Sequence, residues 1–451
     1  MRGSIFSDER IARRIEVLTR SIIEKESVVI HRLAKNEAEQ RSFYRLLHNP
    51  RLETGQVTEF LRRDCLRQVE AGAHYLVIQD TTQPNFERNR HNISDERQLG
   101  VIGDRASLGF FLHPSLVVDA TTGRCLGFSQ VKCWSRDAAA PDKSRRAYKS
   151  RPIEEKESFR WIESAQSSNQ LLARAGMVTH ICDREGDIGE LFGRVPQAER
   201  SHLLVRSAQD RLLSGGGTLS TALATAPVAG HRTLTLKREA RTGRQRRQAR
   251  LEVRYSTLTL QLKEGQRELQ AVQVREVNVP QGQQPVHWRL LTSHRVRSLE
   301  EALEVVEWYS MRWNIEQVFR LLKQKGLNVE ALEVETGKGL VQLTLLALFA
   351  AAKTLLLHLS ARQEEPQPVA GAFSDEQLEC LEAVNEQYEG RTLRQQNPYP
   401  ARTLPYCYWV LARLGGWKPQ EKRAGVIALH RGFIDFQKIY DGWLLARQIV
   451  S

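Results

Sequence analysis

Cysteine is scarce in this chain and follows no pattern that binds metal or forms a disulfide framework. The 451 residues include six cysteines, which are scattered without a Cys-x-x-Cys or Cys/His spacing. This distribution argues against a zinc finger and against a small disulfide-stabilised domain. We therefore expect a protein of a reducing, cytoplasmic compartment.

The chain also lacks the sequence signals of secretion or membrane insertion. Its first residues, MRGSIFSDERIARR, are charged and have no apolar core of the kind found in signal peptides. The stretch GLVQLTLLALFAAAKTLLLHL (339–359) is nearly long enough to span a bilayer, but Gln342, Lys353 and His358 interrupt it. Because charges near the centre of a span are costly, we expect a buried helix and no membrane partner.

Acidic residues are outnumbered by basic ones. The 66 lysines and arginines against 53 acids give a formal net charge of +13. Such an excess favours polyanionic partners, nucleic acid first and a membrane surface second. Charge alone leaves open an enzyme that is merely basic.

The hydrophobic pattern predicts a mixed α/β fold preceded by helices. Residues 8–70 combine strong helix formers with many charges, which is typical of a basic helical domain. The segments HYLVIQD (74–80) and MVTHICD (177–183) are short apolar runs that end in an acid, as buried strands do. Helical patterns alternate with such strands, which indicates a mixed sheet.

The second half of the chain has three further patterns. Residues 211–290 alternate apolar and polar side chains, as one-sided antiparallel strands do, and their arginine-rich connection at 238–250 is a candidate phosphate contact. Residues 299–326 predict one long helix. Residues 363–400 are polar and loosely patterned, which favours a linker before a helical tail from residue 405.

Two acids stand where buried strands end, Asp80 and Asp183. Strand ends are where ligands bind in open α/β sheets, because side chains there emerge into a crevice. A single aspartate in such a place is more often a helix cap or a turn residue. For Asp183 there are two rivals in the same loop, Glu185 and Asp187.

A third acid, Glu316, lies in a polar stripe of the predicted long helix. At about 100° per residue the members of the stripe fall within roughly 80° of arc. They are Tyr309, Arg312, Glu316, Arg320 and Lys323. A surface ladder of i±4 ion pairs would explain the charges of this stripe, but not the aromatic hydroxyl beside them.

Three convergent carboxylates without His or Cys would form a site of oxygen ligands, which suits Mg²⁺ or Mn²⁺ rather than zinc. Two such ions, ~4 Å apart, can activate a water or a 3′-hydroxyl and stabilise the leaving oxygen of a phosphodiester. Without metal, the acids would fit acid/base chemistry on sugars, but the basic stripe favours a phosphate substrate.

These residues together resemble the DDE transposases of the bacterial insertion-sequence-4 family, in particular the transposon-5 type. Asp80 is followed by Thr81-Thr82, and Asp183 stands in CDREGDI, similar to the family's CDRE-D segment. The helix matches the family signature Y-x2-R-x3-E-x6-K. Shorter matches extend over almost the whole chain: EKESFRW (155–161), LLVRS (203–207), PVHWRLLTS (285–293) and LARLGG (411–416).

The resemblance implies a role for each matching residue. Asp80, Asp183 and Glu316 would be the catalytic residues and would hold two Mg²⁺ ions, with Mn²⁺ as a substitute. DNA phosphates would be held by Tyr309, Arg312, Lys323, Arg320 and Arg206. Trp288 would stack on a flipped base, although a tryptophan packed in the sheet is its alternative explanation. The chain has Ala208 where family members often have a basic residue, and its N-terminal segment is shorter, so weaker recognition of DNA ends is expected.

The resemblance also implies an RNase H-like mixed sheet with a β-rich insertion, flanked by helical domains. We expect a helical DNA-binding domain (1–70), a catalytic core in two parts (71–210 and 291–365), an antiparallel β insertion (211–290) and a C-terminal helical dimerisation domain (366–451).

The implied function is cut-and-paste transposition by a homodimer on double-stranded DNA, in the bacterial cytoplasm at the nucleoid. The partners are the terminal inverted repeats and target DNA; the steps are nicking, hairpin formation and resolution, and strand transfer. Two alternatives are a catalytically silent inhibitor derived from a transposase and a metal-dependent structure-specific nuclease.

Overall fold

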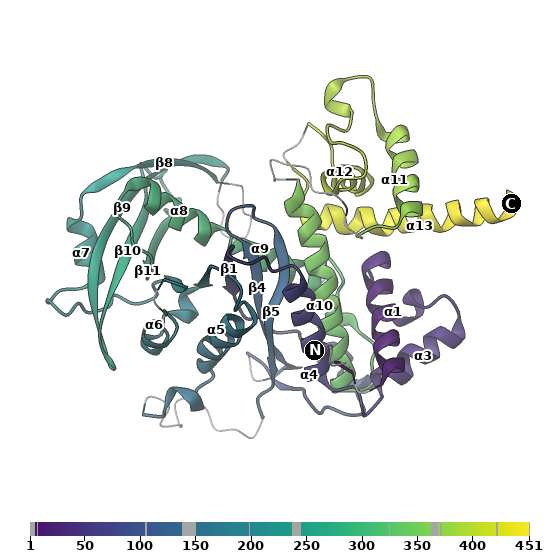
Figure 1. Cartoon of the computed structure of the whole chain (residues 1–451), viewed down its shortest axis with the longest axis horizontal. Coiled ribbons are helices and arrows are strands. Elements are labelled where there is room, and N and C mark those ends of the chain that lie inside the picture. Colours follow the sequence, from purple (N-terminus) through teal and green to yellow (C-terminus); the bar gives the residue numbers. More distant parts are fainter. Residues whose placement is uncertain are drawn as a thin grey trace.

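A single nine-stranded mixed sheet forms the centre of the molecule (Figure 1). The computed structural model describes residues 5–6, 8–103, 106–137, 150–197, 199–236, 245–323, 325–361, 369, 372–420 and 423–450. The strands lie in the order β5-β4-β1-β6-β7-β11-β10-β9-β8. The mixed α/β class predicted from the sequence is confirmed.

The middle of the sheet consists of the strands that the apolar runs predicted. β1 pairs in parallel with β6, and β6 in parallel with β7, while β4 and β11 flank this trio in antiparallel pairing. The first five strands of this sheet along the chain are β1 (His74–Gln79), β4 (Phe111–Asp119), β5 (Cys125–Trp134), β6 (Met177–Cys182) and β7 (Ser201–Arg206). A two-stranded ribbon lies beside them, β2 (Gly100–Val101) with β3 (Leu108–Gly109).

The alternating pattern of 211–290 forms antiparallel strands that extend the same sheet. They are β8 (Val228–Leu236), β9 (Arg247–Leu262), β10 (Gly265–Val277) and β11 (His287–Thr292). β7 joins β11 directly, so the edge of the parallel trio continues into the antiparallel strands without a gap. Of the arginine-rich connection at 238–250, residues 238–244 lie outside the described part of the chain, and Arg247 pairs with Glu276 at 2.8 Å.

Helices cover both faces of the sheet. On one face α10 (Gly337–Ser360) shares a core with Leu76 and Ile78 of β1. On the other face α5 (Phe159–Leu171) places Trp161 and Ile162 in a core with Leu203 of β7. Two short helices belong to this second face, α6 (Gly189–Arg194) and α7 (Leu219–Thr225).

The apolar stretch 339–359 is a buried helix, as expected. α10 is the one helix in the described residues that is long and apolar enough to cross a membrane, and 89% of its most apolar window is buried inside the protein. Its Gln342 donates to the Leu52 carbonyl at 2.8 Å, and Lys353 pairs with Asp64 at 2.7 Å. Two of the three polar residues that interrupt the run therefore contact the N-terminal segment, and the third, His358, lies beside Tyr408 of the C-terminal part.

Those N-terminal helices lie against α10 (Figure 1). They are α1 (Glu9–Lys25), α2 (Ile30–Leu33), α3 (Glu37–Leu47) and α4 (Thr54–Arg67). The C-terminal helices surround a second core of their own: α11 (Asp375–Tyr388), α12 (Leu404–Leu414) and α13 (Val426–Val450). Because α11 is a packed helix with a Ser374 cap, the linker predicted for 363–400 is wrong in that part.

The long helix predicted for 299–326 is also wrong in part, because two helices occupy it. α8 (Leu299–Ser310) ends before a turn at Met311 and Arg312, and α9 (Trp313–Leu322) follows. The Ser310 hydroxyl donates to the Glu307 carbonyl at 2.6 Å, and the amides from 311 to 315 include i→i−3 bonds that tighten the backbone. Lys323 lies beyond α9 in an extended conformation.

Candidate active site

Asp80 and Asp183 follow directly on two neighbouring parallel strands. β1 and β6 pair with Ile78 opposite Ile181, so both aspartates emerge at the same level, two residues further on. Each carboxylate holds its own loop: Asp80 accepts from the Thr81 amide and Asp183 from the Glu185 amide, both at 2.8 Å. The two predicted strand-end acids are thus side by side at the carboxyl edge of the sheet.

Arg312 connects the third acid to the first. Its Nη1 lies 2.9 Å from Asp80 Oδ2, and its Nη2 donates to Glu316 one turn along α9. The side chains of Arg312, Asp80 and Glu316 are 18%, 19% and 29% exposed. α9 therefore brings Glu316 to the strand ends from a point more than 230 residues away in the chain.

Both other acids lie close to Asp80, Asp183 through strand pairing and Glu316 through their shared contact with Arg312. Burial raises the pKa of Asp80 to about 6; the Arg312 guanidinium lowers it, while repulsion by Asp183 and by Glu316 raises it. Three carboxylates thus converge, and one guanidinium balances only part of their charge.

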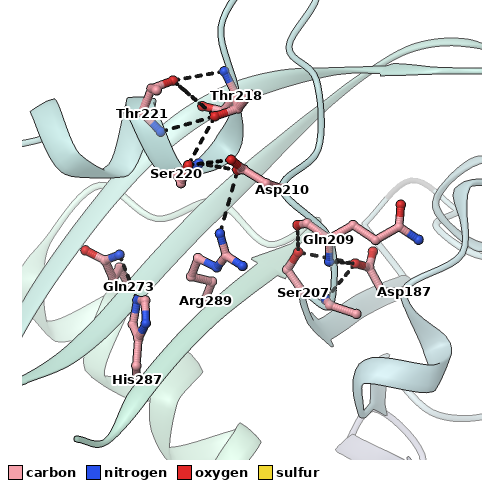
Figure 2. A network of polar contacts seen from close by, with 11 residues as sticks. Asp187, Ser207, Gln209, Asp210, Thr218, Ser220, Thr221, Gln273, His287 and Arg289 are labelled. Carbon is pink, nitrogen blue, oxygen red and sulfur yellow. Dashed lines mark hydrogen bonds and ion pairs between the residues drawn. The ribbon is translucent and has the colours of Figure 1, made fainter.

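Asp187, the rival of Asp183, has a structural role. Its side chain is fully buried and pairs with Arg211 Nε at 2.6 Å. The same carboxylate accepts from the amides of Ala208 and Gln209 at 2.8 and 3.1 Å and from the Ser207 hydroxyl (Figure 2). These partners, which follow β7, satisfy the Asp187 carboxylate inside the protein.

Glu185, the other rival, is exposed and pairs with Arg160 at 2.6 Å. Gly186 lies between Glu185 and Asp187, at a position where only glycine fits. A Cβ at Gly186 would lie 2.4 Å from the Cβ of Cys182. The tight turn after β6 therefore directs Asp183 outward and Asp187 inward.

Tyr309, Arg206 and Trp288 form a group beside the carboxylates. Tyr309 is 4% exposed, and its ring meets the half-buried Trp288 edge-on at 5.3 Å between centroids. Burial raises the pKa of Tyr309, whereas nearby Arg312 and a hydrogen bond with Arg206 lower it. The structure thus brings together the aromatic hydroxyl, the tryptophan and two of the predicted phosphate-binding arginines.

Arg320 and Lys323 are placed differently from the rest of the predicted set. Both are exposed, Arg320 in the last turn of α9 and Lys323 just beyond it. Within the described residues neither makes a hydrogen bond or ion pair with Asp80, Asp183 or Glu316. Their positive charges are therefore exposed at the end of α9 and make no such contact with the carboxylate cluster in the described residues.

The family model of the transposase DDE domain matches residues 58–352, which include all three carboxylates. The chain belongs to the DDE transposases. It is therefore a DNA-cleaving and strand-transferring enzyme, and DNA is its substrate.

DDE transposases generally use divalent metal ions. In the described residues, no three His, Cys, Asp or Glu side chains are arranged to hold a metal. The donors of this transposase nevertheless fit a hard divalent cation, since Asp80, Asp183 and Glu316 offer only oxygen. The guanidinium of Arg312 lies between Asp80 and Glu316 and contacts both.

Arg160, to which sequence reasoning gave no role, supports both aspartate loops of the transposase. Its Nε donates to the Thr81 hydroxyl at 3.2 Å, and its Nη2 pairs with Glu185. The Thr81 hydroxyl also contacts His113 Nδ1 at 2.9 Å. The signal was present in EKESFRW, but the pattern alone does not show which residue α5 directs to the loops.

A basic cluster near the carboxylates was also missed in part. Burial lowers the pKa of His287, and four nearby arginines lower it further: Arg289, Arg275, Arg206 and Arg184. Of these four, Arg289 alone lies within ion-pair distance of an acid in the described part of the chain, Asp210 at 3.6 Å (Figure 2). The members come from four different elements, so no local motif marks the cluster.

Proposed function

We propose that this chain is a cut-and-paste transposase of the insertion-sequence-4 family, similar to the transposon-5 type, with an RNase H-like core. The observation that carries the proposal is the convergence of Asp80, Asp183 and Glu316 at one sheet edge, next to the Tyr309–Trp288 pair. It would nick the ends of its element, form and resolve hairpins, and join the ends to target DNA.

Two Mg²⁺ ions, with Mn²⁺ as a substitute, would be held by Asp80, Asp183 and Glu316. When bound, the metal supplies a nucleophile activated at neutral pH and stabilises the leaving oxygen. The protein's own part is positional: the strand ends and α9 fix the carboxylates, and Arg160 holds the loops after both aspartates.

The phosphates near the scissile bond would contact the basic groups around the site. Arg312 contacts Asp80, Arg206 contacts Tyr309, and arginine binds phosphate through two parallel donors. Arg320, Lys323 and the His287 cluster would hold more distant phosphates. The half-buried Trp288 offers a π-face for an unstacked base, worth ~1–3 kcal/mol.

Flanking segments would supply recognition and assembly. The helical domain at 1–70 would bind the element's ends, and the C-terminal domain at 366–451 would join two copies into a homodimer on DNA. The support for the dimer is α13, whose outer part extends beyond α11 and α12 (Figure 1) and exposes Ile439 and Leu445 to 40% and 60%.

The decisive experiment uses the purified protein, Mg²⁺ or Mn²⁺, and the inverted repeats that flank its own gene. We expect nicked, hairpin and joined products. Asp80→Asn, Asp183→Asn and Glu316→Gln should abolish all three while gel shifts still show DNA binding. Glu307→Gln, an exposed acid of the adjacent α8, is the matched control and should remain active.

Each other outcome names a different function. DNA binding by the unaltered chain without any cleavage would indicate a silent inhibitor. Cleavage without joined products, unaffected by Trp288→Ala, would indicate a structure-specific nuclease. Cleavage that survives one of the three substitutions would remove that residue from the active site.

A further inference from the structure

Arg312 occupies the position at which a cation would neutralise the acidic site. One guanidinium nitrogen lies 2.9 Å from Asp80, and the other donates to Glu316. Asp80 and Glu316 are two of the three ligands that the proposed function requires. In the described residues these acids form no metal-binding group, although their chemistry fits one.

Deprotonation of Arg312 cannot release this ion pair. The guanidinium stays charged at any physiological pH and forms short, charge-assisted hydrogen bonds with carboxylates. The three side chains are less than a third exposed, so solvent screens the pair only partly. A divalent ion entering the DNA-free site must therefore displace Arg312 or bind beside a fixed positive charge.

Phosphate is the natural competitor for that guanidinium. The two non-bridging oxygens of a phosphodiester can accept two parallel N–H donors of a guanidinium, as the two oxygens of a carboxylate do. Arg206 already stands beside Tyr309, so a phosphate arriving there would find a second cation and a phenol close to Arg312. Moving Arg312 onto the phosphate would leave Asp80 and Glu316 without a counter-ion.

We propose that Arg312 is a resident counter-ion that keeps divalent metal out of the site until a DNA phosphate takes its guanidinium. The inference rests on the proposed function and adds a regulation to it: the cation site is completed by substrate. Metal and DNA then bind with positive coupling, so each increases the affinity for the other by the same factor. The DNA-free protein would then have a low affinity for the divalent ion, and bound DNA would raise that affinity.

The test measures Mn²⁺ binding directly, by electron paramagnetic resonance titration of the full chain. Without DNA, Arg312→Gln should bind Mn²⁺ about tenfold more tightly than the unaltered protein, within the usual range of coupling between sites. Arg320→Gln removes the same charge from the exposed side of α9 and should leave Mn²⁺ affinity unchanged. A duplex carrying the element's end should raise the affinity of the unaltered protein toward that of Arg312→Gln.

Three results would overturn the inference: equal Mn²⁺ affinity of the unaltered protein and Arg312→Gln, an equal gain for Arg320→Gln, or no effect of DNA. If Arg312→Gln fails to fold, Mn²⁺-soaked crystals of the unaltered DNA-free protein replace it. We expect Arg312 between Asp80 and Glu316 and no anomalous peak there; a strong peak refutes the proposal. Failure of the proposed function is a separate result, since it would be seen as absence of cleavage with both DNA and metal present.

Discussion

Substitution of Asp187 should unfold the protein locally, whereas substitution of Asp183 should stop its chemistry. The Asp187 carboxylate is fully buried and accepts from Arg211, Ser207 and two backbone amides. Asp187→Ala would leave Arg211, which is 11% exposed, without its partner. Removing one member of a buried ion pair costs about 3–5 kcal/mol. At about 2–4 °C per kcal/mol for a domain of this size, the melting temperature should fall by roughly 10 °C.

Differential scanning calorimetry and the cleavage assay, run on the same preparations, separate the two aspartates. Asp183→Asn should have the same melting temperature as the unaltered protein and produce no nicked DNA. Asp187→Ala/Arg211→Met removes both charges and should recover part of the lost stability, because no unpaired ion stays buried. An Asp187→Ala protein that melts normally but cannot cleave would refute the reasoning and make Asp187 a candidate ligand.

Three further predictions concern pH and base stacking. Burial is the main cause that raises the pKa of Asp80 in the folded protein to about 6. The ionised carboxylate therefore destabilises the fold as pH rises through 6, and this effect is absent below the unfolded pKa near 3.8. Asp80→Asn should raise the melting temperature of the metal-free, DNA-free protein by a few degrees at pH 7.5 and leave it unchanged near pH 4. Burial, with nearby His202 and His74, lowers the pKa of His294 to about 2, so the free energy of unfolding should fall as pH drops through the unfolded pKa near 6.5. In urea titrations between pH 7 and 5, His294→Gln, which can keep the contact with Thr179, should lose less of this free energy than the unaltered protein. An equal loss in both proteins would exclude His294 as the source. Trp288→Ala should lower hairpin yield by about 5- to 150-fold relative to nicking, matching ~1–3 kcal/mol of stacking, while Trp288→Phe recovers part; equal loss of nicks and hairpins would make Trp288 a packing residue only.

The strands were predictable because the burial of each strand leaves a local pattern in the sequence, either a largely apolar run or an alternation of apolar and polar residues. HYLVIQ and MVTHIC are continuous apolar runs since both faces of β1 and β6 are covered, and β9 and β10 alternate because one face is more open. The break between α8 and α9 was not predictable from period alone. Its cause is a set of i→i−3 bonds and a serine back-bond, which leave the apolar spacing on each side intact.

Within the site, the sequence predicted which residues take part but not which side chains contact one another. Position at a strand end does not by itself distinguish Asp183 from Asp187. The family resemblance favours Asp183, and the packing of Ser207–Arg211 against Asp187 shows which of the two carboxylates is buried. Arg312 was expected to contact phosphate. Its bond to Asp80 depends on the meeting of α9 with β1, a contact across 232 residues of sequence.

The turn at Met311 and Arg312 explains how one segment of the chain can carry both the proposed DNA-contact residue Tyr309 and the carboxylate of Glu316. A continuous helix would place Tyr309 and Glu316 on one rigid stripe. Because α8 ends at Ser310 and α9 begins at Trp313, Tyr309 packs with Trp288 and β11, while Glu316 follows the direction of α9 toward β1. Arg312 stands at the junction, within reach of both groups. A phosphate bound beside Tyr309 can therefore act on Glu316 and Asp80 through this single side chain.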